Sequence, residues 1–498
     1  MNDRLPVIVG VGESIDRLES LENSKGPLDL IAEAVANAER DAGVPLAEIT
    51  DQIDVVKHTS VSYDDLAALV KLRLRAGKAT STLSDGSGNG PLREMHNAAL
   101  RIQRGEIQVA LLTGSEAQRS VDHARKQGIR LPWMGKQEAG PVFRAQSYAN
   151  PLAVKYGLEI PFQIYPLYEN ATAPLWGQTP QQARDESARI WANMSEVAAR
   201  NACASARKPL TPREVAEQTA NNRPLAWPYL KFMVAQPSVN VGAAIFLTSV
   251  GHARKLGIAE DRMVFLHGGA AAREPDDYLV RDSYGVNASQ TTVLQTVLAQ
   301  MGWDRSRFEL VDLYSCFPVV PKMARRLLGI AEDGGLTIAG GLSFFGAPVH
   351  NYMSHAAAAT VRQLRAARDG HALLYGQGGN VTKHHALVLS GRAPESLLPE
   401  SFSVQAKADA ARGPVPPLTD AYTGPATLET FTVMHDRHGE PTNGVVLVIT
   451  PAGERALANV PASDTRTIAH LKSLARSPIG DTVQLRPGSA GLTECTVP

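Results

Sequence analysis

The sequence predicts an α/β protein built from two similar halves. Strand-like apolar runs end directly in loops rich in glycine, and helical patterns stand between these runs. The pattern occurs twice, because residues 110–112 precede Gly114 and residues 372–374, with the same Ala-Leu-Leu sequence, precede Gly376. A repeated βαβ unit explains this more economically than two unrelated βα units of similar composition.

The first half starts with a buried type of strand at residues 6–12, apolar on both faces. Its glycines do not form a dinucleotide fingerprint, since Ile15 stands where the third glycine would be and no helix follows at once. An amphipathic helix is predicted from residue 27 to 42, with Gly43 as its C-cap. A strand within residues 51–59 comes next.

A glycine-rich loop at residues 84–90 leads into a helical pattern from Leu92 to Arg104. Beyond the strand at 109–112, residues 118–235 are interrupted by proline and aromatic residues, with helices predicted at about 181–207 and 212–220. An insertion of this length usually shapes a binding site. The strand at 238–249 completes the first half.

The second half begins at residues 263–268, and its strand at 308–313 ends in the sequence Tyr-Ser-Cys-Phe-Pro. A helix of small residues from His355 precedes the strand at 372–375, which breaks into the glycine-rich loop 376–380. Because loops at strand ends are held rigidly by the sheet, we expect the ligand and the chemistry there.

After residue 390 the composition changes. A proline-rich linker at 413–417 precedes strand patterns at 427–433, 444–450 and 482–486. Short strands at this spacing predict a small closed barrel of OB type.

Composition excludes several classes of protein. The 498 residues carry no net charge, which leaves no electrostatic footprint for nucleic acid. Three scattered cysteines are too few for a disulfide framework or a zinc site, and no other metal site is expected. The apolar run 239–250 is too short to span a membrane. We therefore expect a cytoplasmic protein without nucleic-acid or membrane partners.

Several of these pieces, in this order and spacing, resemble the thiolase superfamily, and most closely its bacterial thiolase-like proteins of type 1. The matching pieces are residues 7–12, 105–116, 241–249, 312–317, 340–348 and 376–382, with an OB-type extension at 427–459. The resemblance implies a thiolase fold, a five-layer α/β/α/β/α sandwich of two similar βαβαβ halves, plus a C-terminal OB-like β-barrel. The predicted domains are 1–258, with a loop insertion at about 118–235, then 259–395, and the barrel at 413–498.

The resemblance also locates the family's catalysts, and they are absent. Gly88 stands at the place of the nucleophilic cysteine, Ala347 at that of the histidine, and Gly376 at that of the second cysteine. Losing the nucleophile or its base typically lowers turnover by about 10⁶. Backbone N–H groups near Gly88 and Gly378 could still form an oxyanion hole. Each donor of such a hole typically increases the rate of reaction by roughly 10²–10³.

Five residues in or near the matched motifs are candidates for catalysis: Tyr314, Cys316, His350, Tyr352 and His384. Cys316 is also compatible with a packed thiol of the pocket wall, and Tyr314 with a core tyrosine. The histidines are equally compatible with helix caps or surface groups. A tyrosine acting as a base would need a nearby cation, for which Lys383 is the candidate.

The residues expected to contact the CoA thioester follow from the same resemblance: Ser238, Asn240, Gly346, Ala347, Pro348 and Gly376. The expected function is that of an acyl-CoA enzyme of acetyl-CoA C-acetyltransferase type with replaced catalysts. A retro-aldolase acting on CoA thioesters and a non-catalytic CoA or acyl-CoA binding protein are the alternatives. No cofactor is expected besides the CoA thioester as substrate, and the chain is expected to be a homodimer or a monomer.

Overall fold

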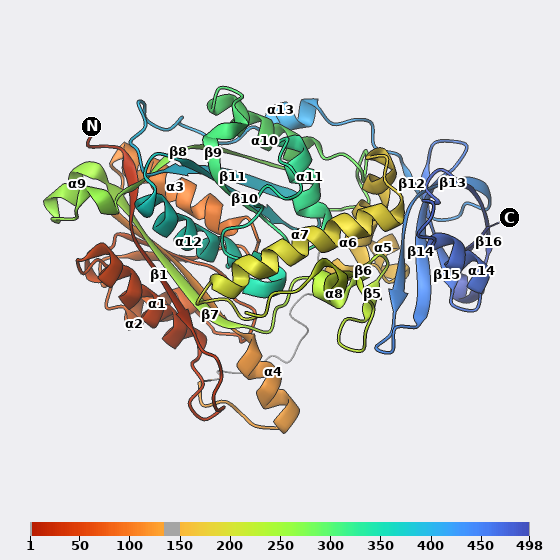
Figure 1. Cartoon of the computed structure of the whole chain (residues 1–498), viewed down its shortest axis with the longest axis horizontal. Helices are drawn as coiled ribbons and strands as arrows, with labels where there is room; N and C mark the ends of the chain where they lie inside the picture. Colours follow the sequence, from red (N-terminus) through yellow and green to blue (C-terminus); the bar gives the residue numbers. More distant parts are fainter. Residues whose placement is uncertain (1, 134–149, 498) are drawn as a thin grey trace.

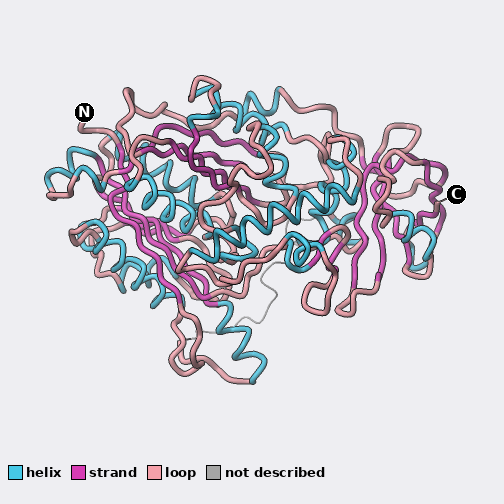
Figure 2. Tube along the Cα trace, in the orientation of Figure 1, coloured by secondary structure: helices cyan, strands magenta, loops and turns pink. Residues whose placement is uncertain are grey.

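The computed structural model describes residues 2–133 and 150–497. Its largest part is a twisted sheet of nine strands in the order β3-β2-β4-β7-β1-β8-β11-β10-β9 (Figures 1 and 2). The strands are β1 (Pro6–Ile15), β2 (Gln52–Val55), β3 (Thr80–Leu83), β4 (Val109–Ala117), β7 (Asn240–Ser249), β8 (Val264–Arg273), β9 (Phe308–Leu313), β10 (His371–Gly378) and β11 (Lys383–Ser390).

The predicted internal repeat is confirmed by the strand pairing. In the first half β2 pairs parallel to β4, β4 antiparallel to β7, and β7 antiparallel to β1. The second half repeats this scheme with β9, β10, β11 and β8 in the same roles. A short pairing of β1 with β8, at Val7 and Ile8, joins the two halves.

Two central helices lie between the halves, and they are the helices predicted from Leu92 and from His355. Helix α3 (Gly90–Arg104) contacts helix α12 (Tyr352–Ala366), and both contact strands of the two halves. Ala98, Ala99, Ala356 and Ala357 are buried on them, and small side chains of this kind allow close packing.

Outer helices cover the remaining faces of the halves. Helix α1 (Pro27–Ala42) packs on β1, β4 and β7, whereas α10 (Ala288–Gln300) packs on β8 and β11 (Figure 1). Helix α1 ends at Gly43, whose φ of 79° is the left-handed conformation that glycine adopts without strain. The alternation of helix and sheet layers is that of a thiolase fold. The other helices near the sheet are α2 (Leu66–Arg73), α9 (Val250–Lys255), α11 (Val319–Leu327) and α13 (Gln405–Ala410).

The segment between β4 and β7 contributes helices and one short hairpin. These elements are α4 (Gln118–Gln127), α5 (Pro151–Lys155), α6 (Pro161–Leu175), α7 (Pro180–Arg200), α8 (Pro212–Ala216), β5 (Pro224–Ala226) and β6 (Tyr229–Leu230). The predicted helices match α7 and α8, but both end earlier than expected. Part of the predicted insertion, residues 134–149, lies outside the described residues.

The C-terminal region is a closed five-stranded barrel, as expected for an OB-like domain. Pairing runs from β13 to β14, β15, β17 and β16, and β16 returns to β13. The elements are β12 (Leu418–Thr419), β13 (Gly424–His435), β14 (Pro441–Ile449), β15 (Arg455–Pro461), α14 (Thr465–Leu471), β16 (Thr482–Pro487) and β17 (Thr493–Thr496). Strand β5 of the insertion also pairs with β13. The exact domain boundaries stay predictions.

Across the described chain, none of the helices is both long and apolar enough to cross a lipid bilayer.

Candidate active site

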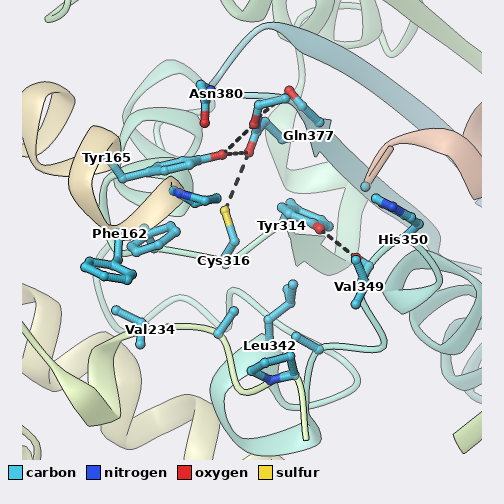
Figure 3. A pocket seen from close by; sticks show the side chains of 18 of the residues that line it. Phe162, Tyr165, Val234, Tyr314, Cys316, Leu342, Val349, His350, Gln377 and Asn380 are labelled. Atoms are coloured by element: carbon cyan, nitrogen blue, oxygen red, sulfur yellow. Dashed lines mark hydrogen bonds between the residues drawn. The ribbon is translucent and has the colours of Figure 1, made fainter. Parts of the chain in front are cut away.

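A cavity of about 420 Å³ opens where loops of both halves meet helix α6 and the β5–β6 segment (Figure 3). Its walls are mainly apolar side chains from five segments of the chain. They include Phe162, Leu225, Val234, Ala235, Phe317, Leu342, Ala347 and Val349. Polar atoms enter the cavity at a few points only, which is typical of a site for a small apolar ligand.

Gly88, which the resemblance places at the position of the nucleophile, meets Tyr314 in the structure. A Cβ atom added to Gly88 would overlap the Tyr314 hydroxyl and the carbonyl oxygen of Gln377. The tyrosine ring thus occupies the space that a side chain at position 88 would need. The Gly88 N–H donates to no acceptor in the described part of the chain, and it lies in the loop that starts helix α3. A hydrogen-bond donor is therefore available where a thioester carbonyl could lie.

The Tyr314 hydroxyl is the second donor at this place. It follows strand β9, is 6% exposed, and reaches only the Val349 carbonyl oxygen, at 3.5 Å (Figure 3). Burial raises its pKa well above 10, so the hydroxyl keeps its proton and acts as a donor. Lys383, the expected cation, lies 3.9 Å from Asp276 and does not line the cavity. The condition for a tyrosinate base is not met.

Gln377 organises the opposite wall. Its Oε1 accepts from the Tyr165 hydroxyl at 3.0 Å and from the Cys316 thiol at 3.6 Å, while its Nε2 donates to the Gly378 carbonyl at 2.7 Å (Figure 3). The Tyr165 ring stacks on Phe317 with ring centroids 4.2 Å apart. All these polar atoms are satisfied within the protein and form a rigid, uncharged wall.

Cys316 lines the cavity as a buried thiol. Burial raises its pKa to about 12, so the thiolate needed for nucleophilic attack is not populated at neutral pH. Its contacts are those of a packed wall residue.

His350 lines the cavity on the side of the glycine loop. Its Nε2 lies 2.5 Å from the place that a Cβ atom of Gly86 would take. Burial lowers its pKa to about 4, so the imidazole is neutral at pH 7. The preceding Val349 has a φ of 41°, a strained conformation for a β-branched residue. Such strain costs about 1–3 kcal/mol and is often kept where a functional side chain must be oriented.

Tyr352 and His384 lie outside the cavity. The Tyr352 hydroxyl donates to Asp312 at 3.4 Å and accepts from the Gly341 N–H at 3.1 Å. His384 is buried on β11, with its Nδ1 2.7 Å from the Tyr375 hydroxyl, and burial lowers its pKa to about 3. Both side chains serve internal hydrogen bonds, so the structure does not bring them to the ligand space.

Of the residues expected to bind the CoA thioester, Ala347 lines the cavity. Ser238 donates instead to Asp122 at 2.8 Å, and Asn240 donates to the Ser120 hydroxyl at 2.8 Å, so both hold the start of α4. The other three, Gly346, Pro348 and Gly376, are buried in neighbouring backbone and do not line the cavity. Gly376 packs on the first turn of α3, since a Cβ atom there would lie 3.0 Å from the Asn89 Cα.

Both predicted oxyanion positions, Gly88 and Gly378, do line the cavity. A Cβ atom at Gly378 would overlap the Ser87 hydroxyl, so the two glycine loops touch closely. Sequence reasoning missed Phe162, Tyr165 and Gln377. The Pro-Phe pair at 161–162 inside a long insertion was a signal for the first of them. Nothing in the sequence pointed to the hydrogen bonds of Gln377.

Within the described residues no group of three or more histidine, cysteine or acidic side chains could hold a metal ion.

Comparison with known proteins shows what the chain as a whole is similar to. Residues 404–489 match the model of the thiolase-like protein type 1 additional C-terminal domain. A monomeric SCP2-thiolase-like protein type 1 from Mycobacterium smegmatis aligns over 100% of both chains, with a TM-score of 0.83 and 28% identity. These two matches support a thiolase-like protein with an additional C-terminal domain. A search of curated proteins finds none that matches.

More distant structures share the fold of this thiolase-like protein. An Ltp2-ChsH2(DUF35) aldolase has a TM-score of 0.58 at 20% identity, covering 78% of this chain and 98% of its own. Human mitochondrial 3-ketoacyl-CoA thiolase in complex with CoA also has a TM-score of 0.58, at 14% identity, covering 79% of this chain and all of its own. Its fold therefore occurs in enzymes of both thiolase and aldolase type.

Proposed function

We propose that this thiolase-like protein binds the acyl group of a CoA thioester in the cavity without forming an acyl-enzyme. The observation that carries the proposal is the contact of Tyr314 with Gly88, which fills the place of a nucleophile and leaves an apolar cavity beside it. The Gly88 N–H and the Tyr314 hydroxyl would donate hydrogen bonds to the thioester carbonyl oxygen. Phe162, Phe317 and Leu342 would cover the acyl chain.

Acyl transfer of acetyl-CoA C-acetyltransferase type has little support in this geometry. The reaction needs a thiolate, and the thiol that lines the cavity, Cys316, has its pKa raised to about 12 by burial. The CoA-bound thiolase of the same fold supports CoA thioesters as the ligand class. The monomeric relative from Mycobacterium smegmatis supports a monomer as the working unit.

The test compares octanoyl-CoA with free CoA by isothermal titration calorimetry. We expect octanoyl-CoA to bind at least about tenfold more tightly, because a buried CH₂ group contributes roughly 0.8 kcal/mol. Ala235→Trp fills the cavity and should remove this difference. Ala331→Trp, at an exposed position away from the cavity, is the matched control.

Intact-mass spectrometry after incubation with acetyl-CoA should find no acetyl adduct. Equal affinities for octanoyl-CoA and CoA, or an unchanged difference in Ala235→Trp, would overturn the proposal. An acetyl adduct on Cys316 would instead support acyl transfer through that thiol.

A second candidate is the retro-aldol cleavage of a β-hydroxyacyl-CoA, favoured by the presence of neutral His350 and Tyr314 on one cavity. The imidazole would take the hydroxyl proton as the bond between C2 and C3 breaks. The electron pair of that bond would form the thioester enolate, which Tyr314 and the Gly88 N–H stabilise. Return of the proton to C2 would complete an aldehyde and a shortened acyl-CoA.

The assay for this candidate uses 3-hydroxyoctanoyl-CoA and follows hexanal and acetyl-CoA by mass spectrometry. Cleavage should slow by roughly 10²-fold in Tyr314→Phe, the effect of losing one oxyanion donor. Tyr352→Phe, outside the cavity, should keep the parent rate. If neither product forms while binding stays tight, the retro-aldol candidate is wrong and only the binding function remains.

A further inference from the structure

The C-terminal barrel touches the same elements that form one wall of the cavity. Helix α6 supplies Phe162 and Tyr165 to that wall, and β5 supplies Leu225. Both elements pack on barrel strand β13, and α6 lies between the barrel and the remaining fold (Figure 1). The wall and the barrel are therefore one structural unit.

Specific hydrogen bonds connect the three segments. The Thr430 hydroxyl of β13 donates to the Leu167 carbonyl of α6. The Asn170 side chain of α6 donates to the Phe431 carbonyl at 2.9 Å and lies 3.5 Å from the Trp227 carbonyl. The Trp227 N–H in turn donates to the Val433 carbonyl at 2.8 Å. Asn170 thus joins helix, barrel and hairpin at one point.

Apolar packing continues across the same boundary. The outer face of the barrel contributes Met434, Val445, Leu447 and Leu457 to the apolar cluster that contains Tyr165 and Phe317. In the opposite direction, the insertion contributes Trp227 to the cluster inside the barrel.

Helix α6 needs this support because it carries two internal prolines. Pro166 and Pro174 lack the N–H that would bond to the carbonyls of Phe162 and Asn170. The first turn, which bears Phe162 and Tyr165, is consequently held by its neighbours as much as by the helix itself.

We propose that the barrel is a positioning element for the acyl pocket, with Asn170 and Thr430 as the residues that fix the α6 wall. This inference rests on the proposed acyl-CoA binding. The barrel then sets which acyl chains fit, although neither positioning residue lines the cavity.

Two variants on one strand test the inference. Thr430→Val removes the hydroxyl that holds α6. Thr432→Val makes the same change on the same strand at a buried hydroxyl without a hydrogen-bond partner in the described chain. Octanoyl-CoA and CoA affinities are measured for each. Losing one hydrogen bond should weaken octanoyl-CoA binding about threefold to tenfold in Thr430→Val. CoA affinity, and both affinities of Thr432→Val, should stay within about twofold.

Asn170→Leu, of similar volume, should give a larger loss that is again confined to octanoyl-CoA. A purely structural role would lower the affinities for CoA and octanoyl-CoA together, or only the melting temperature. Equal octanoyl-CoA affinities of Thr430→Val and Thr432→Val would overturn the inference. Because both of these substitutions are conservative, the comparison between them decides the question even if Asn170→Leu fails to fold. A parent protein that does not prefer octanoyl-CoA over CoA would instead overturn the proposed function.

Discussion

The two halves carry equivalent central helices, but the starts of these helices have different surroundings. The loop before α3 borders the cavity through Gly88, and the loop before α12 borders it through Val349 and His350, whereas Tyr352, the first residue of α12, lies in a polar network outside the cavity. In that network Asp312 accepts from the Ile338 N–H at 2.8 Å and from the Thr337 hydroxyl at 2.9 Å. Both halves therefore contribute a loop to the ligand space, and in the second half the first residue of the helix after that loop serves internal hydrogen bonds.

Tyr314 and Tyr352, both of the second half, show the contrast between ligand space and internal hydrogen bonding within one contact. Their rings meet edge to face with centroids 6.1 Å apart. The Tyr314 hydroxyl faces the cavity with one weak partner, whereas the Tyr352 hydroxyl has Asp312, Thr337 and Gly341 as partners. Two tyrosines in contact thus differ in hydrogen bonding, one with its hydroxyl on the cavity and the other with its hydroxyl bound internally.

The largest effect is expected at acid pH, where the stability of the fold should decrease while ligand affinity of the cavity should not change. Burial lowers the pKa of seven histidines of the described chain, to about 4 for His58, His96, His350, His371 and His435, to about 3 for His384, and well below the usual 6.5 for His385. Since the unfolded chain binds protons at these sites below pH 6.5 and the folded chain does not, their stability contribution is complete above 6.5. It is lost as pH falls toward 4.

Two buried carboxyls oppose this trend. Burial raises the pKa of Glu116 to about 7 and that of Asp312 to about 6, so both favour the folded state more as pH falls. The histidines outnumber them, and urea midpoints should decrease from pH 7.5 to 6 and 5. Octanoyl-CoA affinity should be constant between about pH 5.5 and 8.5, because Tyr314, Cys316 and His350 do not titrate there. A change in octanoyl-CoA affinity with a midpoint near neutral pH would contradict this expected difference between the cavity and the buried interior.

Gly88→Ala should have the next largest effect. The added methyl group would overlap the Tyr314 hydroxyl and lie 2.5 Å from its Cζ atom. Overpacking of this kind costs about 1–3 kcal/mol, and displacement of Tyr314 should weaken octanoyl-CoA binding about tenfold or more. Gly90→Ala is the control, since the nearest atom to its added Cβ is 4.0 Å away. Thermal unfolding and calorimetry measure the two effects. A Gly88→Ala variant with unchanged stability and unchanged octanoyl-CoA affinity would show that Tyr314 does not fill the space beside position 88.

The tyrosine pair should separate binding from stability. Tyr352→Phe removes a donor to buried Asp312 and should lower the free energy of unfolding by about 1 kcal/mol while octanoyl-CoA affinity is unchanged. Tyr314→Phe should do the reverse, with an affinity loss of about threefold to tenfold and little change in stability. Urea denaturation and calorimetry on both variants provide the measurement. An affinity loss in Tyr352→Phe equal to that in Tyr314→Phe would remove the distinction between the two sites.

The smallest effect is expected for Cys316→Ala. A protonated wall thiol contributes packing and one weak hydrogen bond, so octanoyl-CoA affinity and any thioester cleavage should stay within about tenfold of the parent. Calorimetry and a product assay by mass spectrometry test this. A thousandfold loss of turnover with the fold intact would identify Cys316 as a nucleophile.

Much of the framework could be predicted because it depends on local patterns. The glycine-terminated strands at 110–112 and 372–374 and the small residues of the helix from His355 predict the repeated βαβ unit. The strand pattern after residue 427 likewise predicts a closed barrel. Local patterns were less informative about ends, since helix α7 ends at Arg200, seven residues before the predicted residue 207.

The candidate site residues named from the sequence fall into two groups in the structure. Gly88, Gly378, Tyr314, Cys316, His350 and Ala347 line the cavity. His384 and Tyr352 do not, because their neighbours in space, Tyr375 and Asp312, satisfy them internally. The aromatic wall from α6 comes from more than 140 residues earlier in the chain than Tyr314, a juxtaposition that no local pattern encodes.

The sequence by itself determined that Gly88, Ala347 and Gly376 stand where the resemblance to thiolases implies the catalytic cysteines and histidine, because the identity of a side chain at a given position needs no coordinates. Only the tertiary structure decided what takes their place. The contact of Tyr314 with Gly88, the barrel's support of α6 and the division of roles between two tyrosines all depend on residues brought together by packing. Periodicity specifies which face of an element is buried, but not which distant side chain meets it there.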